Sequence, residues 1–161
     1  MRRLTAMLSG TAVLLMAAGL AAQAKPSFAG EWKMMANPDA GGGRGGRPGA
    51  DLIITQDAAS MTVDYPKAPA AMKLTCKLDG SESKNMMAGR GGAAPTEQVS
   101  KAMWSGNTLI VTTTTGAGEE KRTFSTDGGY LVVETSARAR NGGAQNVTRE
   151  TYKKYERGFG G

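Results

Sequence analysis

The sequence predicts an all-β protein, in which an antiparallel up-and-down meander of eight or nine strands closes into a barrel. Three observations predict this fold class. Apolar and polar residues alternate with a period of two in several short segments, turn residues separate these segments, and no stretch after residue 24 keeps a helical period. Closure of the sheet hides strand edges that an open sheet would expose. A two-sheet β-sandwich is the alternative architecture.

The first four strands are predicted at residues 30–36, 50–56, 60–66 and 72–79. The second of them is rich in β-branched residues, which suit a pleated surface. Along the third and fourth, apolar side chains occupy every other position, at Met61, Val63 and Tyr65 and at Met72, Leu74, Cys76 and Leu78. A cluster of turn-forming residues between the second and third strands indicates a hairpin.

The remaining strands are predicted at residues 97–104, 107–115, 119–126, 129–138 and 145–155. Short segments with Gly, Asn or Asp separate them, and these residues tolerate the positive φ angles of tight hairpin turns. Two glycine-rich segments, at about 37–49 and 86–95, interrupt the series. Because glycine loses much conformational entropy when it is fixed in a strand or helix, we expect both glycine-rich segments to be loops.

Residues 1–24 have the features of a signal peptide. Arg2 and Arg3 form a basic head, an apolar stretch follows, and Ala22-Gln23-Ala24 matches a small-residue cleavage site. The apolar stretch is shorter than the roughly 20 residues that a membrane-spanning helix needs, so no membrane span is predicted. We expect a helical leader that is cleaved near Ala24, a single domain over residues 25–161 and a secreted or periplasmic protein. Export by the general or by the twin-arginine route stays open.

Composition excludes several chemistries. The chain has 161 residues, no histidine and one cysteine, so it lacks imidazole-based nucleophile systems, imidazole metal ligands and an intrachain disulfide. The 20 basic and 14 acidic residues leave a modest positive charge that does not indicate nucleic-acid binding. Neither a cofactor nor a metal site is predicted.

The motif Gly30-Glu31-Trp32 resembles the G-x-W signature with which lipocalins and related calycin barrels begin their first strand. The wider order of motifs is similar to small secreted bacterial proteins of lipocalin-like type. It comprises Leu78-Asp79-Gly80, Trp104-Ser105-Gly106-Asn107, Asp127-Gly128-Gly129 and a final strand rich in Tyr, Lys and Arg. The resemblance implies that Trp32 packs at the closed end of the barrel beneath a cation from near the last strand. Arg149 is the expected cation, with Arg157 as second choice.

Candidate ligand-binding residues are Met86, Met87, Arg90 and Trp104. The two methionines are expected in a loop, where they could cover an opening, and basic loops at a barrel mouth could attract an anionic ligand. Each residue has a simpler interpretation, because Trp104 can cover the edge of the core and arginine can simply solubilise a loop. The other methionines fit core filling better than copper binding.

Cys76 and the charged run at 119–122 could be interpreted as functional, but a structural interpretation fits both better. Cys76 shares the face of apolar neighbours, so a buried, unreactive thiol is expected. The run Glu119-Glu120-Lys121-Arg122 has the mixed charge of a solvated hairpin end.

These observations favour an exported, lipocalin-like barrel that binds a small apolar or amphipathic molecule and is not an enzyme. The alternative is an envelope accessory protein with a filled barrel, which would contact a protein partner through its Gly/Arg-rich loops. A histidine-independent hydrolase is the least favoured interpretation, since no acid pair falls in a recognisable catalytic motif.

Overall fold

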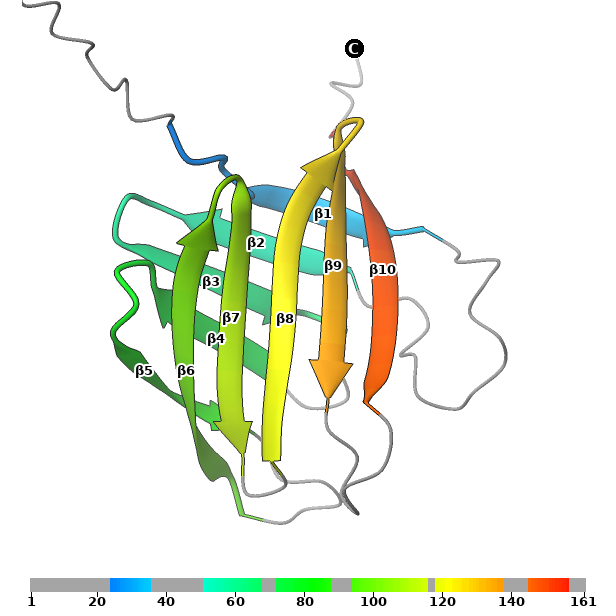
Figure 1. Cartoon of the computed structure of the whole chain (residues 1–161). Helices are drawn as coiled ribbons and strands as arrows, with labels where there is room; N and C mark the ends of the chain where they lie inside the picture. Colours follow the sequence, from blue (N-terminus) through cyan, green and yellow to red (C-terminus); the bar gives the residue numbers. More distant parts are fainter. Residues whose placement is uncertain are drawn as a thin grey trace, which may run out of the picture.

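The computed structural model describes residues 24–35, 51–67, 72–87, 94–115, 118–137 and 145–156, which form ten antiparallel strands (Figure 1). The all-β prediction is confirmed. In chain order the strands are β1 (Gly30–Met34), β2 (Leu52–Gln56), β3 (Ser60–Tyr65), β4 (Met72–Lys77), β5 (Glu82–Met87), β6 (Thr96–Ser105), β7 (Thr108–Thr115), β8 (Gly118–Asp127), β9 (Tyr130–Ala137) and β10 (Asn146–Lys154).

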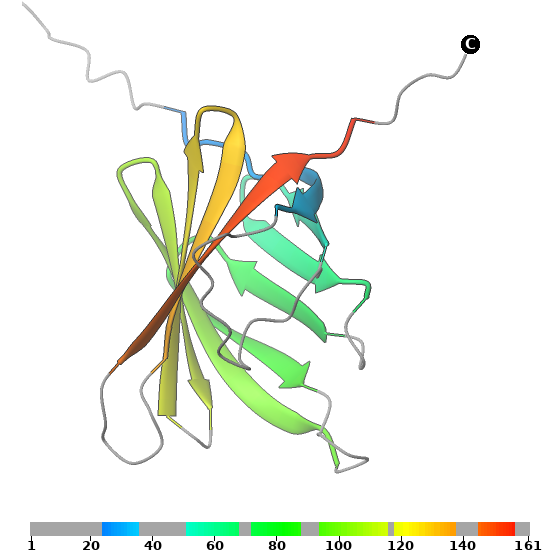
Figure 2. The same cartoon turned by 90° about the vertical axis from the view of Figure 1, so that its right-hand side faces the viewer.

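The strands form a single sheet that curls into a nearly closed barrel. Their order is β4-β3-β2-β1-β10-β9-β8-β7-β6-β5, so each strand pairs with a chain neighbour and β1 also pairs with β10. Figure 2 shows β7–β10 as one wall, with β2–β4 opposite. The up-and-down barrel is therefore confirmed over the sandwich alternative.

The period-two patterns place apolar side chains inside the barrel. Along β4 the burial pattern alternates strictly, with Met72, Leu74 and Cys76 buried and the residues between them exposed. The same alternation in β3 buries Met61 and Val63. These inward residues belong to one core cluster that also receives side chains from β1, β2 and β6–β10.

The strand β5 is a correction to the sequence-based prediction, which assigned Met86 and Met87 to a loop. Both methionines are the last residues of β5, with Met86 exposed on the outer face and Met87 packed against the core. The inward positions of β5 carry Ser83 and Asn85, which are buried. Because these residues are polar, β5 lacks the apolar alternation that reveals the other strands.

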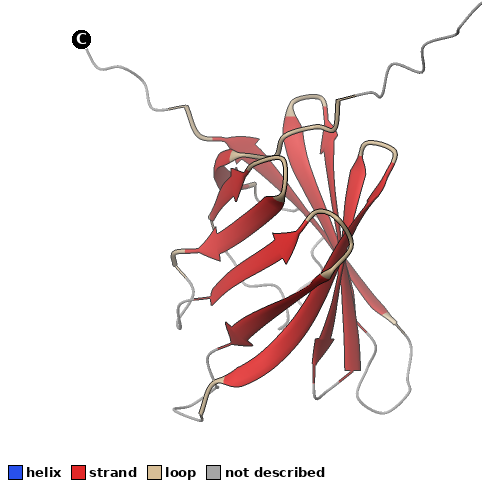
Figure 3. Ribbon diagram, turned by 90° about the vertical axis from the view of Figure 1, so that its left-hand side faces the viewer, coloured by secondary structure: helices blue, strands red, loops and turns tan. Residues whose placement is uncertain are grey.

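Side chains, rather than a backbone ladder, connect β4 to β5. The Asn85 amide accepts a hydrogen bond from Thr75 N at 2.8 Å and donates one to Thr75 O at 3.0 Å. The Ser83 hydroxyl accepts a third from Lys77 N at 2.9 Å. Asn85 thus occupies the position of a missing backbone partner. We call this connection the β4–β5 seam; Figure 3 faces the side on which it lies.

Cys76 is completely buried in the core, as expected. Burial raises the pKa of its thiol to about 11, and the positive charge of Arg122 offsets this only in part. The usual pKa is about 8.5, so the folded protein favours the neutral thiol more strongly than the unfolded chain does. The resulting stability is present below about pH 8.5 and is lost as the pH rises towards 11.

We expect Cys76 to react with a thiol-alkylating reagent at pH 8 at least about 100-fold more slowly in the native protein than in denaturant, because both burial and the raised pKa withhold the thiolate. A labelling time course followed by mass spectrometry measures both rates. Equal rates would contradict a buried thiol.

The predicted loop at 37–49 and the predicted signal peptide, apart from its last residue, lie outside the described residues, as do residues 88–93 of the predicted loop at 86–95. Within the described part of the chain, no helix is long and apolar enough to cross a membrane.

Candidate ligand-binding site

Aromatic side chains close one end of the barrel, where residues 24–29 lie beside β1 (Figure 1). Phe28 is fully buried and stacks on Trp104, with ring centroids 5.8 Å apart. Phe124 also packs against Phe28, with ring centroids 6.2 Å apart. The Gln56 side chain accepts a hydrogen bond from Phe28 N at 2.8 Å, which fixes the backbone that carries this ring.

Trp32 belongs to the same closed end, as the lipocalin resemblance implies. Its ring is buried, and its Nε1 donates a hydrogen bond to Phe28 O at 2.8 Å. The Lys154 ammonium lies 5.7 Å from the ring centroid, within the range of a cation–π contact. Trp32 therefore has a cation from the last strand over its face.

The identity of that cation corrects the prediction of Arg149. Tyr152 faces the core, so Lys154, two residues along β10, shares its face, whereas Arg149 lies on the opposite face. Arg149 instead forms an exposed ion pair with Glu134 at 3.5 Å. Lys154 is also the direct register partner of Trp32. The second choice, Arg157, lies outside the described residues.

Gly30 makes room for this arrangement. Its φ of +145° is one that side chains other than glycine rarely adopt, and an added Cβ would lie 2.9 Å from Lys154 Cε. The glycine of the motif thus lets Lys154 lie across the start of β1.

Charged and phenolic side chains face the interior farther from the closed end. On β8, Arg122 lies two residues before the buried Phe124, and Glu120 two residues before Arg122, so all three share the inward face. Arg122 Nη2 lies 2.6 Å from Glu120 Oε1. Arg122 Nη1 donates a hydrogen bond at 3.1 Å to the hydroxyl of Tyr65, on β3.

A second inward pair comes from β10. The hydroxyl of the buried Tyr152 donates a hydrogen bond to Glu150 Oε2 at 2.7 Å. We call the group formed by Tyr65, Glu120, Arg122, Glu150 and Tyr152 the interior polar cluster.

The electrostatics of the interior polar cluster couple its members. Burial alone would lower the pKa of the Arg122 guanidinium, but Tyr65, Glu120 and Glu150 outweigh this effect and raise that pKa. Burial and the hydrogen bond to Glu150 raise the pKa of the Tyr152 hydroxyl well above its ordinary value. Arg122 is therefore charged and Tyr152 neutral at physiological pH, and Glu150 acts on both.

Hydroxyl and amide groups extend this polar lining towards the seam. Ser100 and Thr113 share a hydrogen bond at 2.9 Å, and Asn85 Nδ2 donates to Ser100 at 3.4 Å. Thr113 is the register partner of Glu120. A continuous polar strip therefore crosses β5–β8 beside the apolar core.

The structure does not bring the predicted ligand-binding residues together. Trp104 lies at the closed end against Phe28, and the Lys25 ammonium lies 5.8 Å from its ring. Met87 pairs with Thr96 at the opposite end of β6. Arg90 lies outside the described residues.

The interior polar cluster is what sequence reasoning missed. Glu120 and Arg122 were expected in a solvated hairpin end, and both instead face the interior. Their even spacing from Phe124, two residues for Arg122 and four for Glu120, is the signal that could have placed them. Tyr65 is 57 residues from Arg122, so nothing local in the sequence links the two.

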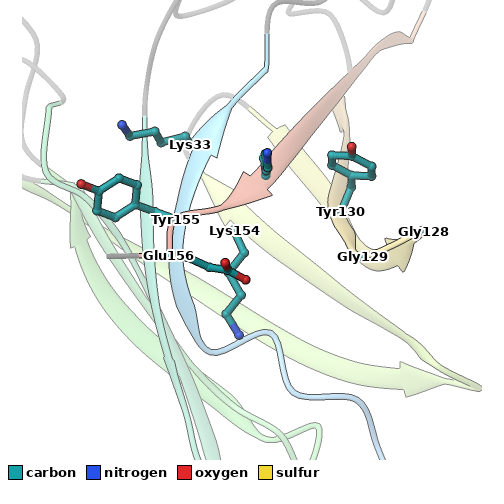
Figure 4. Close-up of a pocket in the computed structure, with 8 residues that line it drawn as sticks. Lys33, Gly128, Gly129, Tyr130, Lys154, Tyr155 and Glu156 are labelled. Atoms are coloured by element: carbon teal, nitrogen blue, oxygen red, sulfur yellow. The ribbon is translucent and has the colours of Figure 1, made fainter. Parts of the chain in front are cut away.

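An outer groove of about 580 Å³ lies near the end of β10, lined by Lys33, Lys153, Lys154, Tyr130, Tyr155, Glu156 and two glycines (Figure 4). The Lys33 ammonium lies 4.3 Å from the ring centroid of Tyr155. Its main charged lining is thus lysine, with Lys33 and Lys153 on the outer face of the barrel and Lys154 next to Trp32.

The acidic residues that the structure describes do not assemble into a metal site. Among the described residues, no group of three or more Cys, Asp or Glu side chains could hold a metal ion.

Several solved structures are similar in fold to this chain. One is named REP1-NXSQ fatty acid transporter, with 14% identity, TM-score 0.58 and coverage of 80% of this chain and 96% of the other. The two chains share the fold of an antiparallel up-and-down barrel. Human cRBP IV is similar at 14% identity and TM-score 0.59, over 81% of this chain and 99% of that one. The fluorescent protein UnaG is similar at 20% identity and TM-score 0.56, over 80% and 97%. No protein-family model and no curated protein matches the sequence.

At these identities the likeness shows the fold alone, and the up-and-down barrel positions the elements described above. In this barrel the aromatic plug of Phe28, Trp32 and Trp104 closes one end, and the interior polar cluster faces the remaining interior.

Proposed function

We propose that the protein is an exported, non-catalytic carrier that binds one small amphipathic molecule inside the barrel. The observation that carries the proposal is the interior polar cluster. Glu120 and Arg122 face inward beside a buried apolar wall. Their side chains are nevertheless 30% and 17% exposed, so solvent reaches them inside the barrel. Burying charge is costly, so a barrel that only needed a filled core would carry apolar residues here.

The polarity of the interior suits an amphipathic ligand. Leu131 and Val133 are buried on β9, while Thr135 continues the same inward face next to Arg122. An alkyl or ring system would contact the first two, and a polar group would reach the interior polar cluster. Small barrels of this kind hold one small ligand when side chains do not fill them. A fatty acid transporter with the same fold supports this use of the barrel.

Export is the second part of the proposal and rests on the leader at residues 1–24. The closed end begins directly after the expected cleavage site. The Lys25 ammonium donates a hydrogen bond to Gly106 O at 3.1 Å, and Gln56 Nε2 donates one to Pro26 O at 3.1 Å. Cleavage near Ala24 would leave these contacts intact.

Native mass spectrometry of the protein purified from its natural host tests the carrier function, and N-terminal sequencing tests export. We expect one co-purifying small molecule per chain and a mature N-terminus near Lys25. An uncleaved N-terminus on protein recovered from the cytoplasm would contradict export.

A matched pair of variants tests where the molecule binds. Thr135→Phe puts a large side chain into the interior, and Thr112→Phe puts the same side chain on the outer face of β7. We expect binding of the neutral, environment-sensitive dye Nile red to fall at least about tenfold in Thr135→Phe and to stay unchanged in Thr112→Phe, since only the first fills the binding space. No binding of dye by the unsubstituted protein, together with no co-purifying molecule, would overturn the carrier function.

A further inference from the structure

The interior polar cluster contains more negative than positive groups. Its one guanidinium, on Arg122, faces two carboxylates, on Glu120 and Glu150. Both terminal nitrogens of Arg122 are already engaged, one by Glu120 at 2.6 Å and the other by Tyr65 at 3.1 Å. The protein itself therefore uses one N–H donor on each terminal nitrogen of this guanidinium.

The carboxylates keep acceptor capacity that the described residues do not use. Within the described part of the chain, Glu120 Oε2 and Glu150 Oε1 accept no hydrogen bond, while the other oxygen of each residue is paired. An ionised carboxylate has acceptor sites on both oxygens and donates none. The Tyr152 hydroxyl gives its only proton to Glu150, so it too has just acceptor capacity left.

We propose that the polar end of the bound molecule is a primary ammonium group, held within the interior polar cluster by the carboxylate of Glu150 beside the Tyr152 hydroxyl. This inference rests on the proposed carrier function and names the class of its ligand, an amphipathic amine. An ammonium group has three donors and no acceptor, which complements these free oxygens, and its charge balances the excess carboxylate. A ligand carboxylate at the remaining N–H groups of Arg122 would instead lie near the carboxylates of Glu120 and Glu150, which would repel it.

The net charge of the whole chain works against this preference, which makes the test discriminating. The chain carries a formal charge of +6, and a basic protein attracts anions nonspecifically. A preference for an amine therefore cannot arise from overall charge and has to come from local groups.

The test measures displacement of Nile red at pH 7 by dodecylamine, dodecanol and dodecanoate, which share one alkyl chain. We expect dodecylamine to bind at least about tenfold more tightly than dodecanoate, with dodecanol between them. Dodecanoate binding as tightly as dodecylamine, or more tightly, overturns the ammonium assignment while leaving the carrier function standing. If none of the three displaces the dye, the carrier function fails, and the assignment fails with it.

Two variants locate the preference. Glu150→Gln removes one negative charge and leaves the Glu120–Arg122 pair intact, and we expect it to weaken dodecylamine binding at least about fivefold relative to dodecanol. Glu97→Gln removes a charge from the outer face, where Glu97 pairs with Lys84, and should leave the ranking unchanged. Equal effects of both variants would overturn the assignment to Glu150, and the ranking in the unsubstituted protein tests the proposal even if a variant folds poorly.

Discussion

Replacing Phe28 by alanine is expected to lower the free energy of unfolding by about 3–5 kcal/mol, the typical cost of truncating a buried phenylalanine. Phe28 is 0% exposed and contacts the rings of both Trp104 and Phe124. Its removal leaves a cavity at the closed end that two aromatic neighbours on different strands cannot easily fill. The loss is large because the variant loses the free energy of burying the ring and also keeps an unfilled cavity in its place.

Urea denaturation monitored by tryptophan fluorescence measures the effect, because Trp104 reports directly on the missing ring. Val147→Ala is the control, since Val147 is 63% exposed on β10 and its truncation should change stability by less than about 0.5 kcal/mol. A loss below about 1 kcal/mol for Phe28→Ala would show that residues 24–29 contribute little to closing the barrel.

Replacing Asn85 by leucine is expected to lower the free energy of unfolding by about 2–3 kcal/mol, although the two side chains have similar size. The substitution removes the two hydrogen bonds to Thr75 N and O, and it also takes a donor from Ser100. Each bond contributes about 1 kcal/mol, and polar groups left without partners add to the cost.

Hydrogen exchange separates this effect from a general loss of stability. In Asn85→Leu the amide of Thr75 should exchange faster, by more than the global destabilisation accounts for, because its acceptor is gone. Lys84→Ala is the neighbouring control; its exposed ion pair with Glu97, at 3.1 Å, should contribute less than about 1 kcal/mol. Unchanged exchange at Thr75 would contradict the role of the Asn85 amide in the β4–β5 seam.

Alternation predicted the strands wherever the inward side chains are apolar. The strand β4 shows this best, because Met72, Leu74 and Cys76 mark its buried face without any knowledge of partners. The same rule failed for β5, whose inward Ser83 and Asn85 look like loop residues until their partners on β4 are known. Polar side chains that replace backbone hydrogen bonds between two strands do not produce the alternation of apolar and polar residues by which a strand is recognised in the sequence.

The site was less predictable than the fold because its members depend on register. The resemblance placed Trp32 at the closed end, but choosing between Arg149 and Lys154 required knowing which face of β10 points inward. Within β8, a mixed-charge sequence is typical of a solvent-facing hairpin, and Phe124 alone indicates which of its charges turn inward. Contacts across the barrel, such as that from Arg122 to Tyr65, arise only when the sheet closes.

The β4–β5 seam also bears on self-association. In an open ten-stranded sheet of this order, β4 and β5 would be the two edges, and each would offer free backbone groups to a strand of another molecule. Here the two edges are adjacent in the chain and face each other, and Asn85 occupies the Thr75 backbone groups. The Asn85 side chain therefore occupies backbone groups of the β4 edge that could otherwise pair with a strand of another molecule, and its loss would expose them to intermolecular strand addition.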